Sequence, residues 1–384
     1  MKTLAIIGYV ITTFASQSIW VTFSPISTYA AEKLGVEVAY IGYLAVLYPT
    51  FFLILTIPSG LLLDRSLKTW LTTGAVLTAL GGVLRLVNEA SYTWLFFCQL
   101  LAAVGQPFLL NGFVPFASHL YPQKMPVVIS LLSLSMYLGT VFALATGLAV
   151  YREAGLHGVM ALHAVISAVG LALYLLGIKA IHISNAESKQ RISLREVAGK
   201  KDLWLIGGIL GLGIAAFDNL ATWLQPALAT VGLGDIAGTA VASAIISGLV
   251  GVTFIPSLVA KRNYRTYYIR TASMIVTALI FTASIILVAP YVYISLAIAG
   301  LLMIPAYPVL MDWIGKFHRR ETHGSASGFV GLISRIISVA MLLTAPSFIN
   351  NAALYLQFIS LLILGAFLIS LNMPNDRNAL NPTA

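Results

Sequence analysis

The sequence predicts an all-α membrane protein with twelve transmembrane helices in two six-helix bundles, and three observations support this fold class. The chain of 384 residues is 59% hydrophobic and only 9% charged, and its mean hydropathy of +0.92 is far above that of soluble globular proteins. Apolar stretches of membrane-spanning length recur from one end to the other. A basic polar stretch divides the chain near its middle, and the two halves share prolines at one constant spacing.

Each apolar stretch is long enough to cross the roughly 30 Å hydrocarbon core of a bilayer at about 1.5 Å of rise per residue. The first stretch is too long for a cleaved signal peptide and has no clear cleavage site, so we expect a retained helix. In chain order, the predicted helices span residues 3–31, 37–63, 69–89, 92–119, 125–151, 157–181, 202–230, 236–260, 267–289, 291–317, 323–348 and 351–373.

The positive charges are distributed unequally between the two sides of the predicted membrane. Eighteen of the 22 lysines and arginines fall on one side, Lys33, Arg85 and Arg152 fall on the other, and Arg335 lies within the membrane. Such an excess marks the cytoplasmic side, which predicts a multi-pass protein of the cell membrane with both termini in the cytoplasm. The net charge of +9 therefore reflects topology and contact with the lipid bilayer, and we expect no nucleic-acid partner.

The longest polar stretch, HISNAESKQRISLREVAGKKD at residues 182–202, separates six predicted helices from six. We predict an N-terminal six-helix bundle over residues 1–181, a cytoplasmic basic linker over 182–201, a C-terminal six-helix bundle over 202–373 and a cytoplasmic tail over 374–384.

The two halves carry an internal repeat. Pro58 and Pro256 are 198 residues apart, and so are Pro107 and Pro305, in equivalent predicted helices. Halves with the same orientation indicate parallel repeats about an axis normal to the membrane, an arrangement that places the substrate site between the repeats near the bilayer midplane.

The same spacing relates Trp20 of the first helix to Asp218 of the seventh. Asp218 lies in the apolar run IAAFDNLATWLQP, residues 214–226, about 24 Å of helical rise from Asp202. An ionised carboxylate at that depth costs several kcal/mol unless it is paired or hydrated. We therefore expect Asp218 to mark a cavity or a partner.

The segment from Gly60 to Lys68, GLLLDRSLK, resembles the G-x3-D-R-x-x-[RK] motif of the major facilitator superfamily. With twelve helices and a central basic loop, it implies that superfamily's fold and transport by alternating access. Gly60 would allow close helix approach, and Asp64 would face the positive N-terminus of helix eleven. Arg65 and Lys68 would complete a cytoplasmic clasp, the inner gate. Leu67 stands where the motif has its second glycine.

Five segments carry a closer resemblance: IWVTFSPIS (19–27), YPTFFLILTIPSGLLLD (48–64), AAVGQPFLLNGFVPFASHLYP (102–122), GIAAFDNLATWLQ (213–225) and ETHGSASG (321–328). They resemble a narrower family, the feline leukaemia virus subgroup C receptor-related solute carriers. That group includes choline and ethanolamine carriers, historically discussed as haem exporters, and relatives that move pyridoxine with protons.

This resemblance implies roles for three residues. Trp20 and Gln106 match a tryptophan and a glutamine that line the pocket of the choline-handling members. Those members have a tyrosine at the position of Asp218, and an aromatic ring holds a quaternary ammonium by about 1–2 kcal/mol per face. A carboxylate keeps the preference for cations and adds a titratable group, which favours a cation with N–H donors or proton coupling.

Arg335, on predicted helix eleven, is the expected partner of Asp218, because the family fold places helices seven and eleven side by side. Three interpretations stay open. Protonation of Asp218 could release Arg335 and so couple transport to protons; the two could form a locked structural pair; or Arg335 could bind an anionic substrate.

The two pocket residues of the first half also have structural interpretations, and two more residues are pocket candidates. Trp20 could instead anchor the outer membrane surface, and Gln106, beside Pro107, could instead join helices by a hydrogen bond. Tyr307 and Asn111 are candidate substrate-binding residues, although core packing is the more ordinary role of Tyr307.

Other polar residues have structural interpretations. We expect Arg85 and Glu89, four residues apart, to pair at the outer surface, and Asp312 and Lys316 to pair at the cytoplasmic end of helix ten. His163 is expected to be a satisfied core residue.

No catalytic constellation, Walker loop, metal site or cofactor motif is found, and the single cysteine, Cys98, excludes a disulfide within the chain. We predict a monomeric transporter, not an enzyme, that carries a small organic cation such as a choline-like or other amine. The first alternative is a proton-coupled exporter of a vitamin-like or drug-like solute with Asp218 as proton carrier. The second is a non-transporting membrane receptor or scaffold.

Overall fold

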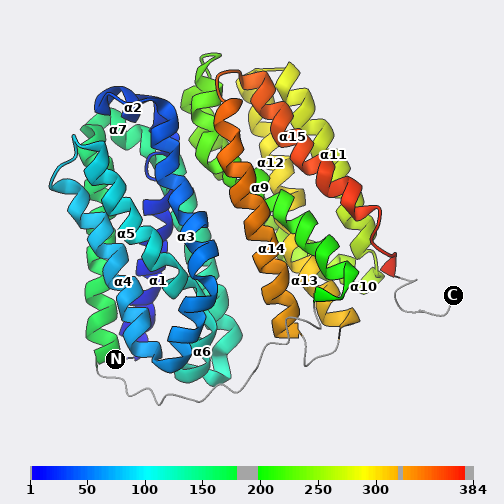
Figure 1. Ribbon diagram of the computed structural model, residues 1–384, viewed down its shortest axis with the longest axis horizontal. Coiled ribbons are helices and arrows are strands. Elements are labelled where there is room, and N and C mark those ends of the chain that lie inside the picture. The colour runs from blue at the N-terminus through cyan, green and yellow to red at the C-terminus, as the bar shows by residue number, and fades with distance from the viewer. Residues whose placement is uncertain (1, 180–197, 319–322, 377–384) are drawn as a thin grey trace. The chain divides into compact units, whose positions relative to one another are not determined.

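The computed structural model describes residues 2–179, 198–318 and 323–376 and divides the chain into two compact units (Figure 1). The first unit is Met1–Lys189, coloured from blue to green, and the second is Gln190–Ala384, coloured from green to red. The division falls inside the predicted basic linker. All regular elements of the described residues are helices, which confirms the predicted fold class.

The first unit contains the elements that correspond to the first six predicted helices. They are α1 (Lys2–Trp20), η1 (Ser24–Ile26), α2 (Ser27–Leu34), α3 (Val38–Arg65), α4 (Leu67–Val83), η2 (Leu84–Leu86), α5 (Tyr92–Asn111), α6 (Phe113–Leu120), η3 (Pro122–Lys124) and α7 (Met125–Lys179).

The second unit contains the elements that correspond to the last six predicted helices. They are α9 (Lys201–Ala229), η4 (Gly234–Ile236), α10 (Ala237–Arg262), α11 (Arg265–Ile285), α12 (Ala289–Met303), α13 (Ala306–Phe317), α14 (His323–Thr344), η6 (Ala345–Ser347) and α15 (Ala352–Ser370).

Eleven ranges of the described residues are long and apolar enough to cross a membrane, and one of them, Val127–Lys179, holds two helices. Gly155 interrupts α7 with φ 65° and ψ −165°, which are not helical angles. This break lies between the fifth and sixth predicted helices. The eleven ranges therefore correspond to all twelve predicted helices. The fourth, predicted over residues 92–119, differs in its end: α5 ends at Asn111, and α6 follows it as a separate helix.

The helices of the two units repeat the 198-residue spacing of the prolines. Adding 198 to the first residue of α1, α3, α4, α5 or α7 gives a position within one residue of the start of α9, α10, α11, α12 or α14. The packing also repeats. In the first unit α1 packs on α7, and α5 packs on both α3 and α4; in the second, α9 packs on α14 and α15, and α12 packs on both α10 and α11.

The internal repeat fails at Trp20 and its equivalent in the second unit, Asp218. Helix α1 ends at Trp20, and Pro25 follows in the turn η1. Helix α9 continues past the equivalent position, Asp218, to Ala229. Proline has no backbone N–H and disfavours helix in the residue before it, so the first helix is broken above Trp20.

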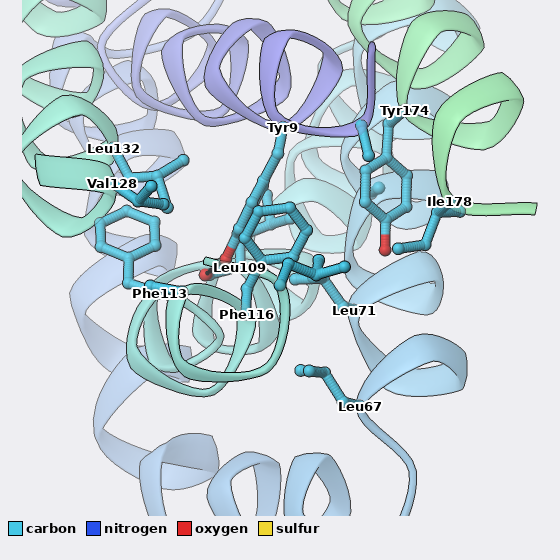
Figure 2. Close-up of a cluster of buried hydrophobic side chains, with 14 of the residues drawn as sticks. Tyr9, Leu67, Leu71, Leu109, Phe113, Phe116, Val128, Leu132, Tyr174 and Ile178 are labelled. Carbon is cyan, nitrogen blue, oxygen red and sulfur yellow. Dashed lines mark hydrogen bonds between the residues drawn. The ribbon is translucent and has the colours of Figure 1, made fainter. Parts of the chain in front are cut away.

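A buried aromatic cluster forms the core at one end of the first unit (Figure 2). Figure 2 shows Tyr9 reaching from α1 toward Leu109 and Phe116. The Tyr9 hydroxyl donates a hydrogen bond to the carbonyl of Leu109, near the junction of α5 and α6, and its ring meets that of Phe116 edge to face at 4.8 Å. The cluster thus ties the ends of two helices to the start of the chain.

The segment after the last helix docks against α11. The Asp376 carboxylate accepts hydrogen bonds from the backbone N–H groups of Arg265 and Thr266, each at 3.1 Å, and pairs with the Arg265 guanidinium at 3.0 Å. Asp376 is only 3% exposed. Residues 374–376 of the predicted tail are therefore part of the second unit, whereas residues 377–384 lie outside the described residues.

The predicted pair of Asp312 with Lys316 is wrong. Asp312 pairs instead with Arg265 on α11 at 2.5 Å, and the Lys316 ammonium donates to the Asn263 side chain. The guanidinium of Arg265 offers several fixed donors, so it bridges Asp312 and Asp376 at once.

Gly155→Ala is expected to lower the melting temperature of the purified protein. The angles at Gly155 are open essentially to glycine alone, and another residue there costs about 1–3 kcal/mol. No atom lies within 4 Å of the place that a Cβ would occupy, so the loss reflects backbone strain and not a clash.

Gly331→Ala is the matched control, because Gly331 lies inside helix α14 and has equally open surroundings. Alanine there should leave the melting temperature unchanged or raise it slightly. Equal behaviour of the two variants would show that the break in α7 does not need glycine.

Candidate functional site

Asp218, on α9, binds two side chains of α14. Arg335 Nη1 donates to Asp218 Oδ2 at 3.1 Å, and Ser338 Oγ donates to the same oxygen at 2.6 Å. Residues three apart lie on one face of a helix, so α14 presents both groups to α9 together. The sequence analysis did not single out Ser338, although it lies three residues after Arg335 and therefore on the same face of the predicted helix.

The two carboxylate oxygens of Asp218 differ. Both hydrogen bonds end on Oδ2. Oδ1 accepts no hydrogen bond from a described residue, and it is not fully enclosed by the protein. One oxygen is therefore fixed by the protein, and the other can receive a proton or a donor group.

Close packing of α9 on α14 holds this pair in place. Gly207 and Gly211 on α9 lie so close to Ile333 and Ile337 that an added Cβ would come within 2.9 Å of each. The Trp223 indole donates to the carbonyl of Leu342 at 3.2 Å on the other side of Asp218. The carboxylate thus lies between two fixed contacts of the same helix pair.

The site is enclosed on the Asp218 side and open on the Arg335 side. The Asp218 side chain is 4% exposed, and that of Arg335 is 29% exposed. Tyr307 is 56% exposed and lies on α13, which packs on both α9 and α14. The second unit therefore joins Asp218 of α9 with Arg335 and Ser338 of α14 as one polar group.

Trp20 is held in the first unit by contacts on two sides. Its indole N–H donates to the carbonyl of Ala45 on α3 at 3.1 Å. The Gln99 amide, on α5, donates to the carbonyls of Ile19 and Trp20 at 2.9 and 3.4 Å, at the point where helix α1 ends. The indole N–H is already used, so only the ring of Trp20 is left to contact a ligand.

Gln106 and Asn111, both on α5, differ in how their amides are used. Gln106 is 5% exposed, and its amide has no hydrogen bond to any described residue. The Asn111 amide donates to the Thr56 carbonyl at 3.0 Å and to Ser59 Oγ at 2.8 Å. Thr56 is eleven residues beyond Ala45 on α3, about 16 Å of rise, so Asn111 and Trp20 contact different ends of that helix.

The motif residues make few contacts inside the first unit. Lys68 donates to the carbonyl of Lys179 at the end of α7 at 3.1 Å. Asp64 and Arg65 are exposed and have no hydrogen bond or ion pair with described residues of this unit. No atom lies within 4 Å of a Cβ placed on Gly60, so the close approach expected there is not made within the unit. Their role as an inner gate stays a prediction.

The predicted surface pair of Arg85 with Glu89 is wrong. Arg85 is fully buried and donates to Thr22 Oγ1 at 3.1 Å, whereas Glu89 pairs with His157 at 2.8 Å. Arg85 lies in the 3-10 turn η2, whose three residues per turn move residues four apart onto different faces. His163 is confirmed as a buried, partnered residue, with Nδ1 2.9 Å from Thr22 Oγ1.

Comparisons with known proteins indicate a family. The sequence model of the Major Facilitator Superfamily matches residues 6–342. An uncharacterized protein of Archaeoglobus fulgidus is 24% identical over 205 residues, which are 52% of this chain and 92% of that protein.

Solved transporter structures share the fold. A bacterial homologue of the human lysosomal transporter Spinster has a TM-score of 0.73 at 12% identity and covers 96% of this chain and 95% of its own. The nucleoside transporter NupG has a TM-score of 0.74 at 13% identity, covering 95% and 98%. A D-xylose–proton symporter has a TM-score of 0.73 at 13% identity, covering 98% of both chains.

A double-mutant cycle of Asp218→Asn and Arg335→Gln should show strong coupling in thermal unfolding. Arg335→Gln leaves an enclosed carboxylate without its counter-charge and is expected to cost about 1–3 kcal/mol. Asp218→Asn should cost less, because the partly exposed Arg335 can reach water.

The double variant is therefore expected to be about as stable as Asp218→Asn alone. Losses that simply add would contradict an energetic link between the two groups.

Proposed function

The chain belongs to the major facilitator superfamily and is a multi-pass membrane transporter of small solutes, and we propose that its transport is coupled to protons through Asp218. The observation that carries this proposal is the pair of Asp218 with Arg335, in which both donors use Oδ2 and Oδ1 stays available. The solute is a small organic molecule of the vitamin-like or drug-like class.

The pair supports coupling because its charge can be removed by one proton. An ionised carboxylate at this depth needs Arg335 as counter-charge. A proton on Oδ1 neutralises Asp218 and weakens its hold on the guanidinium. Arg335, already 29% exposed, then turns toward the solute or toward water. Loss of the proton restores the pair.

Ser338 supports the same cycle as a positioning residue. Its hydroxyl donates to Oδ2 at 2.6 Å and is buried with Asp218. This bond can persist when Oδ1 is protonated, so the carboxyl group keeps its orientation while its charge changes. Tyr307, exposed on the neighbouring helix α13, is suited to contact the solute.

A second candidate is a carrier of small organic cations, such as a choline-like or other amine. The ring of Trp20 and the unused amide of Gln106 favour it in the first unit, and the Asp218 carboxylate favours it in the second. In this case an amine competes with Arg335 for Asp218, and its N–H groups bind Oδ1. The inner gate formed by Gly60, Asp64, Arg65 and Lys68 is common to both candidates.

Asp218→Asn is expected to abolish solute transport driven by a pH gradient and to preserve solute exchange, since the amide keeps shape but cannot carry the proton. The measurement uses purified protein in liposomes with an internal pH dye and a panel of amines, pyridoxine, and neutral and anionic solutes.

The matched control is Asp202→Asn, which removes a carboxylate from the same helix α9, where it pairs with His318 at 2.7 Å. This variant should keep the gradient-driven flux. If Asp218→Asn stops the binding of amines alone, the cation carrier is the better function. Gradient-driven flux at the wild-type rate in Asp218→Asn would exclude Asp218 as proton carrier, and no flux of any solute would favour a receptor.

A further inference from the structure

Arg85 is a buried cation without a counter-charge in the part of the chain that the structure describes. Its side chain is fully buried between helices of the first unit. The nearest acid in sequence, Glu89, is paired with His157, and no ion pair among the described residues includes Arg85. This group is separate from the Asp218 site, and the proposed transport cycle does not use it.

The contacts of Arg85 satisfy only part of its guanidinium. Nη1 donates to Thr22 Oγ1 at 3.1 Å, and the ring of Phe23 lies 5.9 Å from the guanidinium carbon. Nε and Nη2 have no hydrogen-bond partner, although both are fully enclosed. The hydroxyl of Tyr48 is 1% exposed and also without a partner. Tyr48 lies three residues after Ala45 on α3, one helical turn from the carbonyl that accepts from the Trp20 indole, and Trp20 is two residues before Thr22.

Burial without a counter-charge is costly. Removing an ion from water costs several kcal/mol even after the protein relaxes, and one neutral hydrogen bond with one aromatic face does not offset that cost. Water molecules could complete the hydrogen bonds, but they carry no charge. A small anion supplies both the missing acceptor and the missing charge.

We propose that Arg85 and Tyr48 form an internal binding site for a small inorganic anion of the halide class. The donors are Nε and Nη2 of Arg85 and the hydroxyl of Tyr48. Because Arg85, Tyr48 and Gln99 are fully buried, a small ion fits this place better than a large organic anion. Gln99 Oε1, also unpartnered, is an acceptor, so it would meet the anion only through a water molecule that donates to both.

The site is connected to the break in the first helix. Thr22, which accepts from Arg85, lies two residues after Trp20, and Gln99 binds the carbonyl of Trp20 with its other amide atom. A bound anion therefore stabilises the region that orients Trp20. Its loss should loosen this region without touching Asp218.

The test is the melting temperature of the purified protein in sodium chloride, with sodium gluconate keeping the ionic strength constant. Chloride and bromide should raise the melting temperature in a saturable way, because a ligand that binds only the folded state stabilises it by mass action. Arg85→Gln should remove this response. Lys33→Gln, which deletes an exposed outer-side cation, should keep it.

Tyr48→Phe keeps the test decisive if Arg85→Gln does not fold. Loss of one hydrogen bond to a charged group, about 1.5–3 kcal/mol, should raise the half-saturating chloride concentration about tenfold or more. A wild-type protein that does not respond to halides, an Arg85→Gln variant that responds like wild type, or an unchanged half-saturation in Tyr48→Phe would overturn the proposal.

Discussion

Water solvates an ionised side chain far better than a bilayer or a packed helix interface does, and this constraint governs the polar residues of both units. Asp218 meets it with Arg335 and Ser338, supplied by a neighbouring helix. Arg265 meets it at the end of the second unit with Asp312 and Asp376. Arg85 meets it only in part, through Thr22 and the ring of Phe23, and two of its nitrogen atoms have no partner.

The helices were predictable because apolar length is a direct signal of membrane crossing, and the repeated prolines gave the correct spacing of the two halves. The breaks were harder to predict. Gly155 interrupts α7 through its backbone angles, and the end of α1 at Trp20 depends on Pro25 five residues later. Apolar periodicity continues across such breaks. Pro25 marks the first of them in the sequence, whereas the break at Gly155 is visible only in the backbone angles.

The hydrogen-bond and ion-pair partners of the polar residues were harder to predict from the sequence than the helices. Asp218 stood out because a carboxylate in an apolar run is expensive, and Arg335 was its nearest rare counterpart. Ser338 did not stand out, since serine is common in membrane helices. The pairs Arg85–Glu89 and Asp312–Lys316 assumed regular helix and local partners. In the structure a 3-10 turn redirects Arg85, and Arg265 from another helix takes Asp312.

The central claim is that Asp218 exchanges the Arg335 cation for a proton. The most direct measurement is infrared difference spectroscopy of the protein during a pH titration, with the Asp218→Asn variant as reference. The account predicts a carboxylic-acid carbonyl band that appears on acidification and is missing from the variant. A band that is identical in both proteins, or no band at any pH at which transport occurs, would contradict the account.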